Sequence, residues 1–374
     1  MKSLFSLFDL LLLIGMTQGV ITSVLLLRSK KNQPSNTFLA LALIAFCLLS
    51  SKMLFNSLDL YSIAYLNYFP LGIDFAIAPL IYFYISSLIT PNFKFQTKQL
   101  LHFVPFLLFQ SYAFFIYFIT LGLDSREEKN ALVQDYWHAP IKMWEDYLNI
   151  GFIAIYLLIG FFKLKEYRQK INDSISDNTY PTFGWLMKIF ILSSVLWGII
   201  CINMLLDVFF GFRNHYIFHW QIFYLYTAFL IYYLGFVGYQ QPSFDIQGID
   251  TLKKPNKQIS DEKFNTIEVK LCKALEQDKV FLNPTLNAKD LAKKLSISQA
   301  NLSVVVNQAF NKNFRDLINH YRLEEFKTKL AENDDSQFSI LSLALDCGFN
   351  SEASFYRIFK KQTGMSPKEF ANSV

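Results

Sequence analysis

Residues 291–310 read LAKKLSISQANLSVVVNQAF, and residues 343–361 read LALDCGFNSEASFYRIFKK. Each stretch predicts a short helix, a tight turn and a second helix. The inward positions of the two second helices match at a constant offset of 53 residues: Leu302 with Phe355, Val305 with Ile358, and Val306 with Phe359. Helix pairs of this kind place their second helix in the major groove of DNA. The sequence therefore predicts two DNA-reading helices near the C-terminus.

The two turns use different residues for a similar geometry. Gly348 supplies the second turn, because a tight corner between helices often needs a positive φ angle. Phe349 is expected to fill this corner as Ile297 fills the first one. Ser298 and Ser351 stand just before the reading helices, and serine is a favoured N-cap residue. These residues predict where both reading helices begin.

Between the two helix pairs, residues 314–332 (FRDLINHYRLEEFKTKLAE) predict one long helix. At 1.5 Å per residue this helix is roughly 28 Å long. A rigid spacer of that length holds two reading helices about one DNA turn apart, roughly 34 Å. Arg322 in this helix is predicted to be structural, paired with Glu325 or Asp346. Further helices are predicted to begin at Ser260, Asn287 and Ser366.

Residues 275–370 closely resemble the AraC-type (AraC/XylS) family of bacterial transcription regulators. The resemblance rests on Leu291 with Ala292, on Ser298 with Leu302, on YRLEEFKTKL at residues 321–330 and on CGFNSEASFYRIFKKQTGMSP at residues 347–367. It implies sequence-specific binding to double-stranded promoter DNA. It also implies transcriptional activation in the usual case, with RNA polymerase as a partner.

Some parts of the chain depart from the family pattern. Asn311 to Asn313 stand where many members have Gly, and Ala371 stands where many have an Arg that adds one backbone contact. The N-terminal half does not resemble the sugar-binding cupin of the best-known members. Its hydropathy is instead similar to that of membrane-bound variants with a multi-span sensor.

Helix geometry predicts which side chains face DNA once the inward positions are assigned. Gln and Asn suit adenine edges, Arg suits guanine, and small apolar groups suit thymine methyl groups. Arg357 is the foremost candidate for a base contact, whereas each Lys equally suits a phosphate contact or plain solvation. The predicted DNA-binding residues of the first helix-turn-helix motif are Gln299, Ala300, Ser303, Val304 and Asn307. Those of the second motif are Glu352, Ala353, Tyr356, Arg357, Lys360 and Lys361.

The first 240 residues have a composition that suits a bilayer. Hydrophobic residues make up 52% of the whole chain and charged residues 17%, with 39 Phe and 20 Tyr, and the charged residues before Gln240 form short islands between apolar runs. A membrane-spanning helix needs roughly 20 apolar residues. Residues 4–14 look like a signal-peptide core, but the apolar run continues to Leu27, which indicates a retained helix. Seven spans are predicted, at residues 4–27, 37–58, 69–90, 100–123, 144–162, 185–210 and 218–239.

Lys and Arg in the short connections predict the orientation of these spans. Nine such residues lie in the odd-numbered connections: Arg28, Lys30, Lys31, Lys94, Lys98, Lys163, Lys165, Arg168 and Lys170. Four lie in the even-numbered ones: Arg126, Lys129, Lys142 and Arg213. This excess predicts a multi-pass protein of the bacterial cytoplasmic (inner) membrane, with its N-terminus outside and its C-terminal part in the cytoplasm.

Two features inside the spans support more specific hypotheses. Lys52 and Asp74 fall at a similar depth in adjacent spans, so they are expected to form an ion pair; the alternative is that each reaches water near an interface. Gly15 and Gly19 form a small-xxx-small step, which raises a homodimer through the first span as a hypothesis.

The sequence predicts an all-α chain with three parts: a seven-helix transmembrane sensor at 1–240, a linker at 241–259 and a DNA-binding domain with two helix-turn-helix motifs at 260–374. No P-loop, dinucleotide-binding fingerprint or HExxH motif occurs, so no enzyme and no cofactor are predicted. Four isolated cysteines indicate no disulfide framework or metal site. The predicted partners are promoter DNA, the lipid bilayer, RNA polymerase, a second copy of the chain and an unidentified signal ligand. The alternative is a receptor or transporter whose helical tail docks a protein.

Overall fold

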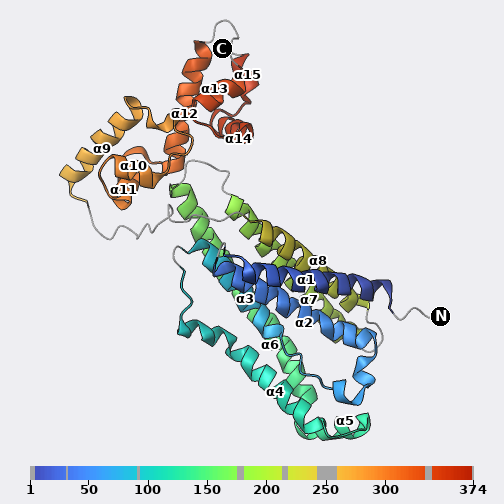
Figure 1. Cartoon of the computed structure of the whole chain (residues 1–374). Helices are drawn as coiled ribbons and strands as arrows, with labels where there is room; N and C mark the ends of the chain where they lie inside the picture. Colours follow the sequence, from blue (N-terminus) through green and yellow to red (C-terminus); the bar gives the residue numbers. More distant parts are fainter. Residues whose placement is uncertain are drawn as a thin grey trace. The chain divides into compact units, whose positions relative to one another are not determined.

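The computed structural model describes residues 5–30, 33–90, 93–174, 181–212, 218–241, 259–332 and 339–372 (Figure 1). These described residues form helices, turns and irregular connections, without a β-strand among them. The chain divides into two compact units. We call residues 1–164 with 185–244 the membrane unit, and residues 165–184 with 245–374 the C-terminal unit. Each unit is described by itself.

Six helices in the N-terminal part are long and apolar enough to cross a membrane, and they correspond to six of the seven predicted spans. The remaining predicted span, 69–90, contains a helix of only 16 residues, α3 (Asp74–Ile89), which is roughly 24 Å long. The six long helical segments are Leu7–Arg28, Ser35–Ser57, Thr97–Thr120, His138–Gln169, Gly184–Phe210 and Phe218–Gln240. Together they are typical of a multi-pass membrane protein.

In helix order, these segments belong to α1 (Leu7–Arg28), α2 (Ser35–Ser57), the 3-10 helix η3 (Thr97–Phe103) with α4 (Val104–Thr120), α6 (His138–Ser174), α7 (Pro181–Phe210) and α8 (Phe218–Gln240). The fourth connection contains a helix that was not predicted, α5 (Arg126–Asp135). Ser125 caps it by accepting a hydrogen bond from the backbone N–H of Glu127 at 3.2 Å. A capping serine followed by acidic residues was the signal available in the sequence.

Helices α1, α2, α3 and α8 pack together to form the centre of the membrane unit. The step formed by Gly15 and Gly19 faces α8 rather than the outside. A Cβ atom on Gly15 would lie 2.9 Å from the Cβ of Ala228, and one on Gly19 would lie 2.5 Å from the Cγ2 of Ile231. The prediction that this step forms a homodimer contact is therefore wrong, because both glycines are buried where α1 packs closely against α8 of the same chain.

The hypothesis of an ion pair between Lys52 and Asp74 is confirmed. The Nζ of Lys52 lies 2.5 Å from a carboxylate oxygen of Asp74 and joins α2 to the first turn of α3. Asp207 is paired in a similar way, with His219 Nε2 at 2.7 Å and the indole N–H of Trp220 at 3.0 Å. Asp74 and Asp207 thus both have partners, which lowers the cost of placing these carboxylates at membrane depth.

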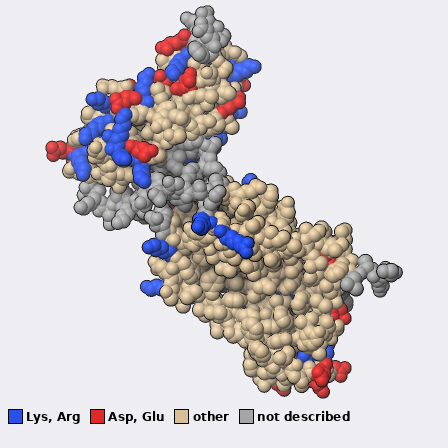
Figure 2. Space-filling model, in the orientation of Figure 1, with Lys and Arg blue, Asp and Glu red and all other residues tan. Residues whose placement is uncertain are grey.

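Large apolar side chains cover the outside of the membrane unit. Figure 2 shows wide areas of its visible face without Lys, Arg, Asp or Glu. Exposed Leu, Ile, Val and Phe side chains occur on all six long helices, for example Leu7, Leu108, Ile155, Ile202 and Phe229. A surface of this kind suits contact with lipid chains rather than water.

The C-terminal unit contains α9 (Asp261–Glu276), the 3-10 helix η6 (Val280–Leu282), α10 (Ala288–Lys294), α11 (Gln299–Phe310), α12 (Phe314–Ala331), α13 (Ile340–Asp346), α14 (Glu352–Thr363) and α15 (Pro367–Ala371). Two apolar cores form in this unit. The first lies among α9, α10, α11 and the start of α12, and the second lies among the end of α12, α13 and α14. Helix α12 contributes to both cores and runs between the two helix pairs (Figure 1).

Candidate nucleic-acid interface

The first helix-turn-helix unit consists of α10, a short turn and α11. Ser296 in the turn has a positive φ angle of 56°, and Ile297 packs against the first core. Ser298 caps α11, since its Oγ accepts a hydrogen bond from the backbone N–H of Asn301 at 3.2 Å. The predicted inward residues Leu302, Val305 and Val306 are all buried. Because one face of α11 is held by the core, its opposite face is directed outward.

The second unit consists of α13, a turn and α14. Gly348 has a φ angle of 88°, as predicted, and Phe349 is buried in the corner. Ser351 caps α14 by accepting a hydrogen bond from the backbone N–H of Ser354 at 3.3 Å. The predicted inward residues of α14, Phe355, Ile358 and Phe359, are buried in the second core. The two units therefore use the same buried positions in their second helices.

A buried arginine on α12 connects the two helix-turn-helix units within the C-terminal unit. Arg322 is only 2% exposed, and its guanidinium donates hydrogen bonds to the carbonyl oxygens of Phe281 at 2.7 Å and Asn283 at 2.8 Å. The structural role predicted for this residue is confirmed. Glu325, one of its two predicted partners, forms an ion pair with Lys279 at 2.8 Å.

The turn of the second unit lies against the same segment. A Cβ atom on Gly348 would lie 2.6 Å from the carbonyl oxygen of Phe281, 2.8 Å from that of Leu282 and 3.0 Å from the Nε of Arg322. Only glycine allows this close approach of the backbone. The segment from 281 to 283, Arg322 and Gly348 form one junction, which we call the Arg322 junction. It restricts how far the two reading helices can move relative to each other.

None of the eleven predicted DNA-binding residues is buried. Of these residues, those on α14 are exposed apart from the partly exposed Tyr356, and those on α11 are partly exposed apart from the exposed Asn307. The amide of Asn307 lies within 3.4 Å of the hydroxyl of Ser303, one turn earlier on the same face. The Nε2 of Gln299 is buried and has no hydrogen-bond partner among the described residues. Apart from the buried amide nitrogen of Gln299, both helices therefore present the predicted polar residues on the face opposite their core.

Lys and Arg side chains are numerous on the visible face of the C-terminal unit (Figure 2). Some of them have acidic partners: Lys294 lies 3.1 Å from Asp278, and Lys327 lies 2.9 Å from Glu324. Arg357, Lys360 and Lys361 on α14 are exposed. Exposed cations on a reading helix suit contacts with phosphate oxygens or with guanine.

Two cysteines lie in the C-terminal unit: Cys347 is buried and Cys272 is partly buried. Burial raises the pKa of the Cys347 thiol to about 11, and burial also raises the pKa of Cys272. A raised thiol pKa opposes thiolate formation, which both nucleophilic and metal-binding roles require. Among the described residues, no group of His, Cys, Asp and Glu has the arrangement of a metal site.

Comparisons with known proteins agree with this geometry. Residues 291–373 match the family model of a helix-turn-helix domain. Uncharacterised HTH-type transcriptional regulators of Staphylococcus aureus strains MW2 and COL are each 29% identical over 112 residues, which is 30% of this chain and 14% of theirs. The chain therefore spans about one seventh of the length of these relatives. No solved structure matches the chain. Residues 291–373 are an AraC-type helix-turn-helix domain.

Proposed function

We propose that this chain is a membrane-anchored transcription regulator, not an enzyme, and that it binds promoter DNA in a sequence-specific manner. The observation that carries the proposal is the pair of reading helices with matched buried faces and exposed polar faces, joined through α12 and the Arg322 junction. A tail that only docked a protein would not need two polar faces of this kind. The six apolar helices supply the anchor.

In this proposal, residues 1–240 form the membrane domain, 241–259 the linker and 260–374 the DNA-binding domain. Residues 242–258 of the linker lie outside the described residues. Helix α3 counts as the seventh span, since most of its residues are buried among the other helices and need no contact with lipid along the whole helix. Seven spans and the excess of Lys and Arg in the odd-numbered connections support an N-terminus outside and a DNA-binding domain in the cytoplasm.

The DNA contacts are assigned as follows. Arg357 binds a guanine edge, while Gln299 and Asn307 bind adenine edges. Lys360 and Lys361 bind phosphates and set the register of α14 on the duplex. The support for the roles of Asn307, Arg357, Lys360 and Lys361 is their exposure on the outward faces of α11 and α14, whereas Gln299 is partly exposed in the first turn of α11. Ala300, Ser303, Val304, Glu352, Ala353 and Tyr356 complete the two faces.

A signal received by the membrane domain controls the DNA-binding domain in this proposal. The signal changes the packing of the membrane helices or the association between chains, and the linker transmits this change. The local concentration of paired DNA-binding domains is altered as a result. RNA polymerase is the proposed partner at the promoter. Replacing the linker with a long flexible one should blunt the response, and an unchanged response would contradict this route.

The decisive test is to map DNA bound by the full chain in bacterial cells and to repeat the mapping with Arg357→Ala. We expect a small set of promoters that share one sequence, and loss of selectivity in the variant. Lys368→Ala, which alters an exposed lysine of α15 outside both reading helices, is the control. Uniform binding along the genome would contradict sequence-specific recognition, and a reporter fused to the C-terminus that is active only outside the cytoplasm would contradict the topology.

A further inference from the structure

Two cavities lie side by side in the membrane unit, and they differ in charge. The first has a volume of about 390 Å³ and is lined by Lys52, Arg126, Lys142 and His138; we call it the basic cavity. The second has a volume of about 510 Å³ and is lined by Asp74, Asp146, Asn149, Trp220 and Tyr224; we call it the acidic cavity. Both volumes lie in the range of sites for small molecules.

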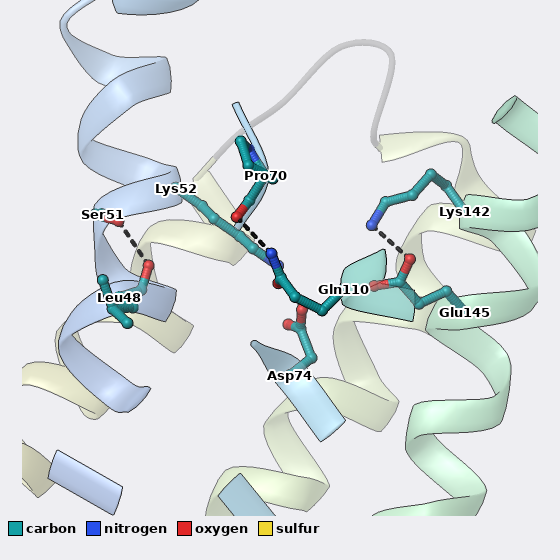
Figure 3. Close-up of polar contacts among 8 residues, drawn as sticks. All are labelled: Leu48, Ser51, Lys52, Pro70, Asp74, Gln110, Lys142 and Glu145. Carbon is teal, nitrogen blue, oxygen red and sulfur yellow. Dashed lines mark hydrogen bonds and ion pairs between the residues drawn. The ribbon is translucent and has the colours of Figure 1, made fainter. Parts of the chain in front are cut away.

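The two cavities meet at one place. Lys52, Asn56 and Tyr61 line both of them. Lys52 is paired there with Asp74, and the two side chains are 25% and 22% exposed, so that each remains accessible from a cavity. Figure 3 shows Lys52 and Asp74 directed toward each other, with Gln110 and the Lys142–Glu145 pair nearby. The ion pair therefore stands at the boundary between a basic and an acidic compartment.

The basic cavity is suited to a carboxylate. Its lining contains three cations, Lys52, Arg126 and Lys142, against one carboxylate, that of Asp59. Glu145 binds Lys142 at 2.6 Å, whereas Arg126 is exposed and has no ion-pair partner among the described residues. A guanidinium binds a carboxylate through two parallel hydrogen bonds. Arg126 is thus the cation most available to a ligand.

The acidic cavity is suited to an ammonium group. Its lining contains two carboxylates, those of Asp74 and Asp146, against one cation, Lys52, together with the aromatic rings of Trp220 and Tyr224. Asn149 lines the acidic cavity and also the apolar pocket beside α3, and its Oδ1 has no hydrogen-bond partner among the described residues. An ammonium group supplies three hydrogen-bond donors, which suit the carboxylates of Asp74 and Asp146. Aromatic faces add cation–π attraction.

We propose that the two cavities together bind a small zwitterion, an amino acid or a short peptide with free termini, with its carboxylate in the basic cavity and its ammonium group in the acidic one. Such a ligand lies across the Lys52–Asp74 pair. Its carboxylate attracts Lys52 and its ammonium group attracts Asp74, so the ligand competes with the ion pair. The pair joins α2 to α3, so binding changes a contact between two central helices. Only the role of this ligand as the signal rests on the proposed function; its binding does not.

The experiment uses the purified full chain in detergent, without DNA, and measures its melting temperature. The probes are the twenty amino acids and the corresponding Ala-Xaa dipeptides, each in free, N-acetylated and C-amidated form. We expect at least one free compound to raise the melting temperature by about 5 °C at 100 times its dissociation constant. The same compound with either terminus capped should bind at least roughly tenfold more weakly.

Variants locate the site. Arg126→Gln alters an exposed side chain and should leave the fold intact while weakening binding roughly tenfold. The double variant Lys52→Met with Asp74→Leu removes both charges together, so that no unpaired charge is left behind, and should reduce the difference between free and capped compounds. Arg28→Gln, at the end of α1 and outside both cavities, is the matched control and should bind normally.

Three outcomes would overturn the proposal: no free compound stabilises the chain, capped compounds bind as well as free ones, or Arg126→Gln and the double variant bind as the unaltered chain does. Because no DNA is present, each result is independent of promoter binding. A chain that binds a zwitterion but no promoter would overturn the proposed function and leave this inference standing.

Discussion

The two helix-turn-helix units share a backbone plan but differ in their reading helices. Helix α11 contains no charged residue, whereas α14 carries Glu352, Arg357, Lys360 and Lys361. The turns differ as well. Both contain a residue with positive φ, which is Ser296 in the first turn and Gly348 in the second, but only Gly348 is in a position where the segment from 281 to 283 leaves no room for a Cβ atom. In the proposed complex with DNA, α11 therefore supplies neutral hydrogen bonds and shape, and α14 supplies charge. The comparison also shows that the second turn is a structural contact between the units.

The largest expected effect comes from breaking the junction that holds the two units. Arg322→Ala leaves the carbonyl oxygens of Phe281 and Asn283 buried without these donors, and each hydrogen bond to a charged group contributes about 1.5–3 kcal/mol. We expect the free energy of unfolding of the C-terminal unit to fall by about 3 kcal/mol or more, measured by urea denaturation. Lys327→Met, which breaks an exposed pair on the same helix, should cost less than about 1 kcal/mol. Equal effects of the two variants would contradict the role of the junction.

The second prediction separates close packing from backbone strain at the second turn. Gly348→Ala places a Cβ 2.6 Å from a backbone oxygen, in addition to adopting an unfavourable positive φ. We expect a loss of about 2–3 kcal/mol in the free energy of unfolding. Gly364→Ala has a similar φ of 82° but nothing within 4 Å, so strain alone should cost it roughly 1 kcal/mol. If both variants lost the same amount, the close approach to the segment from 281 to 283 would be unimportant.

The third prediction tests the difference in charge between the two reading helices. Arg357→Ala and Asn307→Ala should each weaken binding to the mapped promoter by about 1–3 kcal/mol, because each removes a contact to a base edge. Lys361→Ala should instead reduce the slope of log affinity against log salt by about 1, since it removes a phosphate contact. Fluorescence anisotropy at several salt concentrations measures both quantities. A lower salt slope in Asn307→Ala would contradict the assignment of neutral readout to α11.

The smallest expected effect concerns pH and the cap of α15. Hydrogen bonds from the backbone N–H and hydroxyl of Ser366 lower the pKa of Glu369 from its ordinary value of 4.5. A carboxyl whose pKa is lowered on folding stabilises the fold above its unfolded pKa, and that stability is lost as the pH falls through the folded pKa. Glu369→Gln should therefore lower the melting temperature at pH 7 by an amount on the order of 1 °C, and by less at pH 3. An equal loss at both pH values would show that ionisation of Glu369 does not matter.

Most of the C-terminal unit could be predicted because its signals are local. Serine caps precede both reading helices, and the apolar positions recur at helical spacing in both of them. Gly348 marks a turn that needs a positive φ angle. Each of these features depends on residues within a few positions along the chain, so the sequence contains it directly.

The Arg322 junction and the role of Gly15 and Gly19 could not be predicted in the same way. Arg322 binds carbonyl oxygens about forty residues earlier, and every residue has a carbonyl oxygen, so no sequence pattern distinguishes these acceptors. A small-xxx-small step indicates that a helix packs closely but does not name the other helix. Here it is α8 of the same chain.

The sequence by itself determined six long apolar helices, the repeated helix-turn-helix pattern and the depth match of Lys52 with Asp74, but not α5 or the short length of α3. The features that it determined follow from short-range periodicity and from the cost of polar groups in hydrocarbon. Only the tertiary structure decided that the two reading units are joined at Arg322, that α1 packs on α8 and that two cavities of opposite character meet at the Lys52–Asp74 pair. These features arise between residues distant along the chain, where packing in three dimensions selects one partner from many chemically equivalent ones.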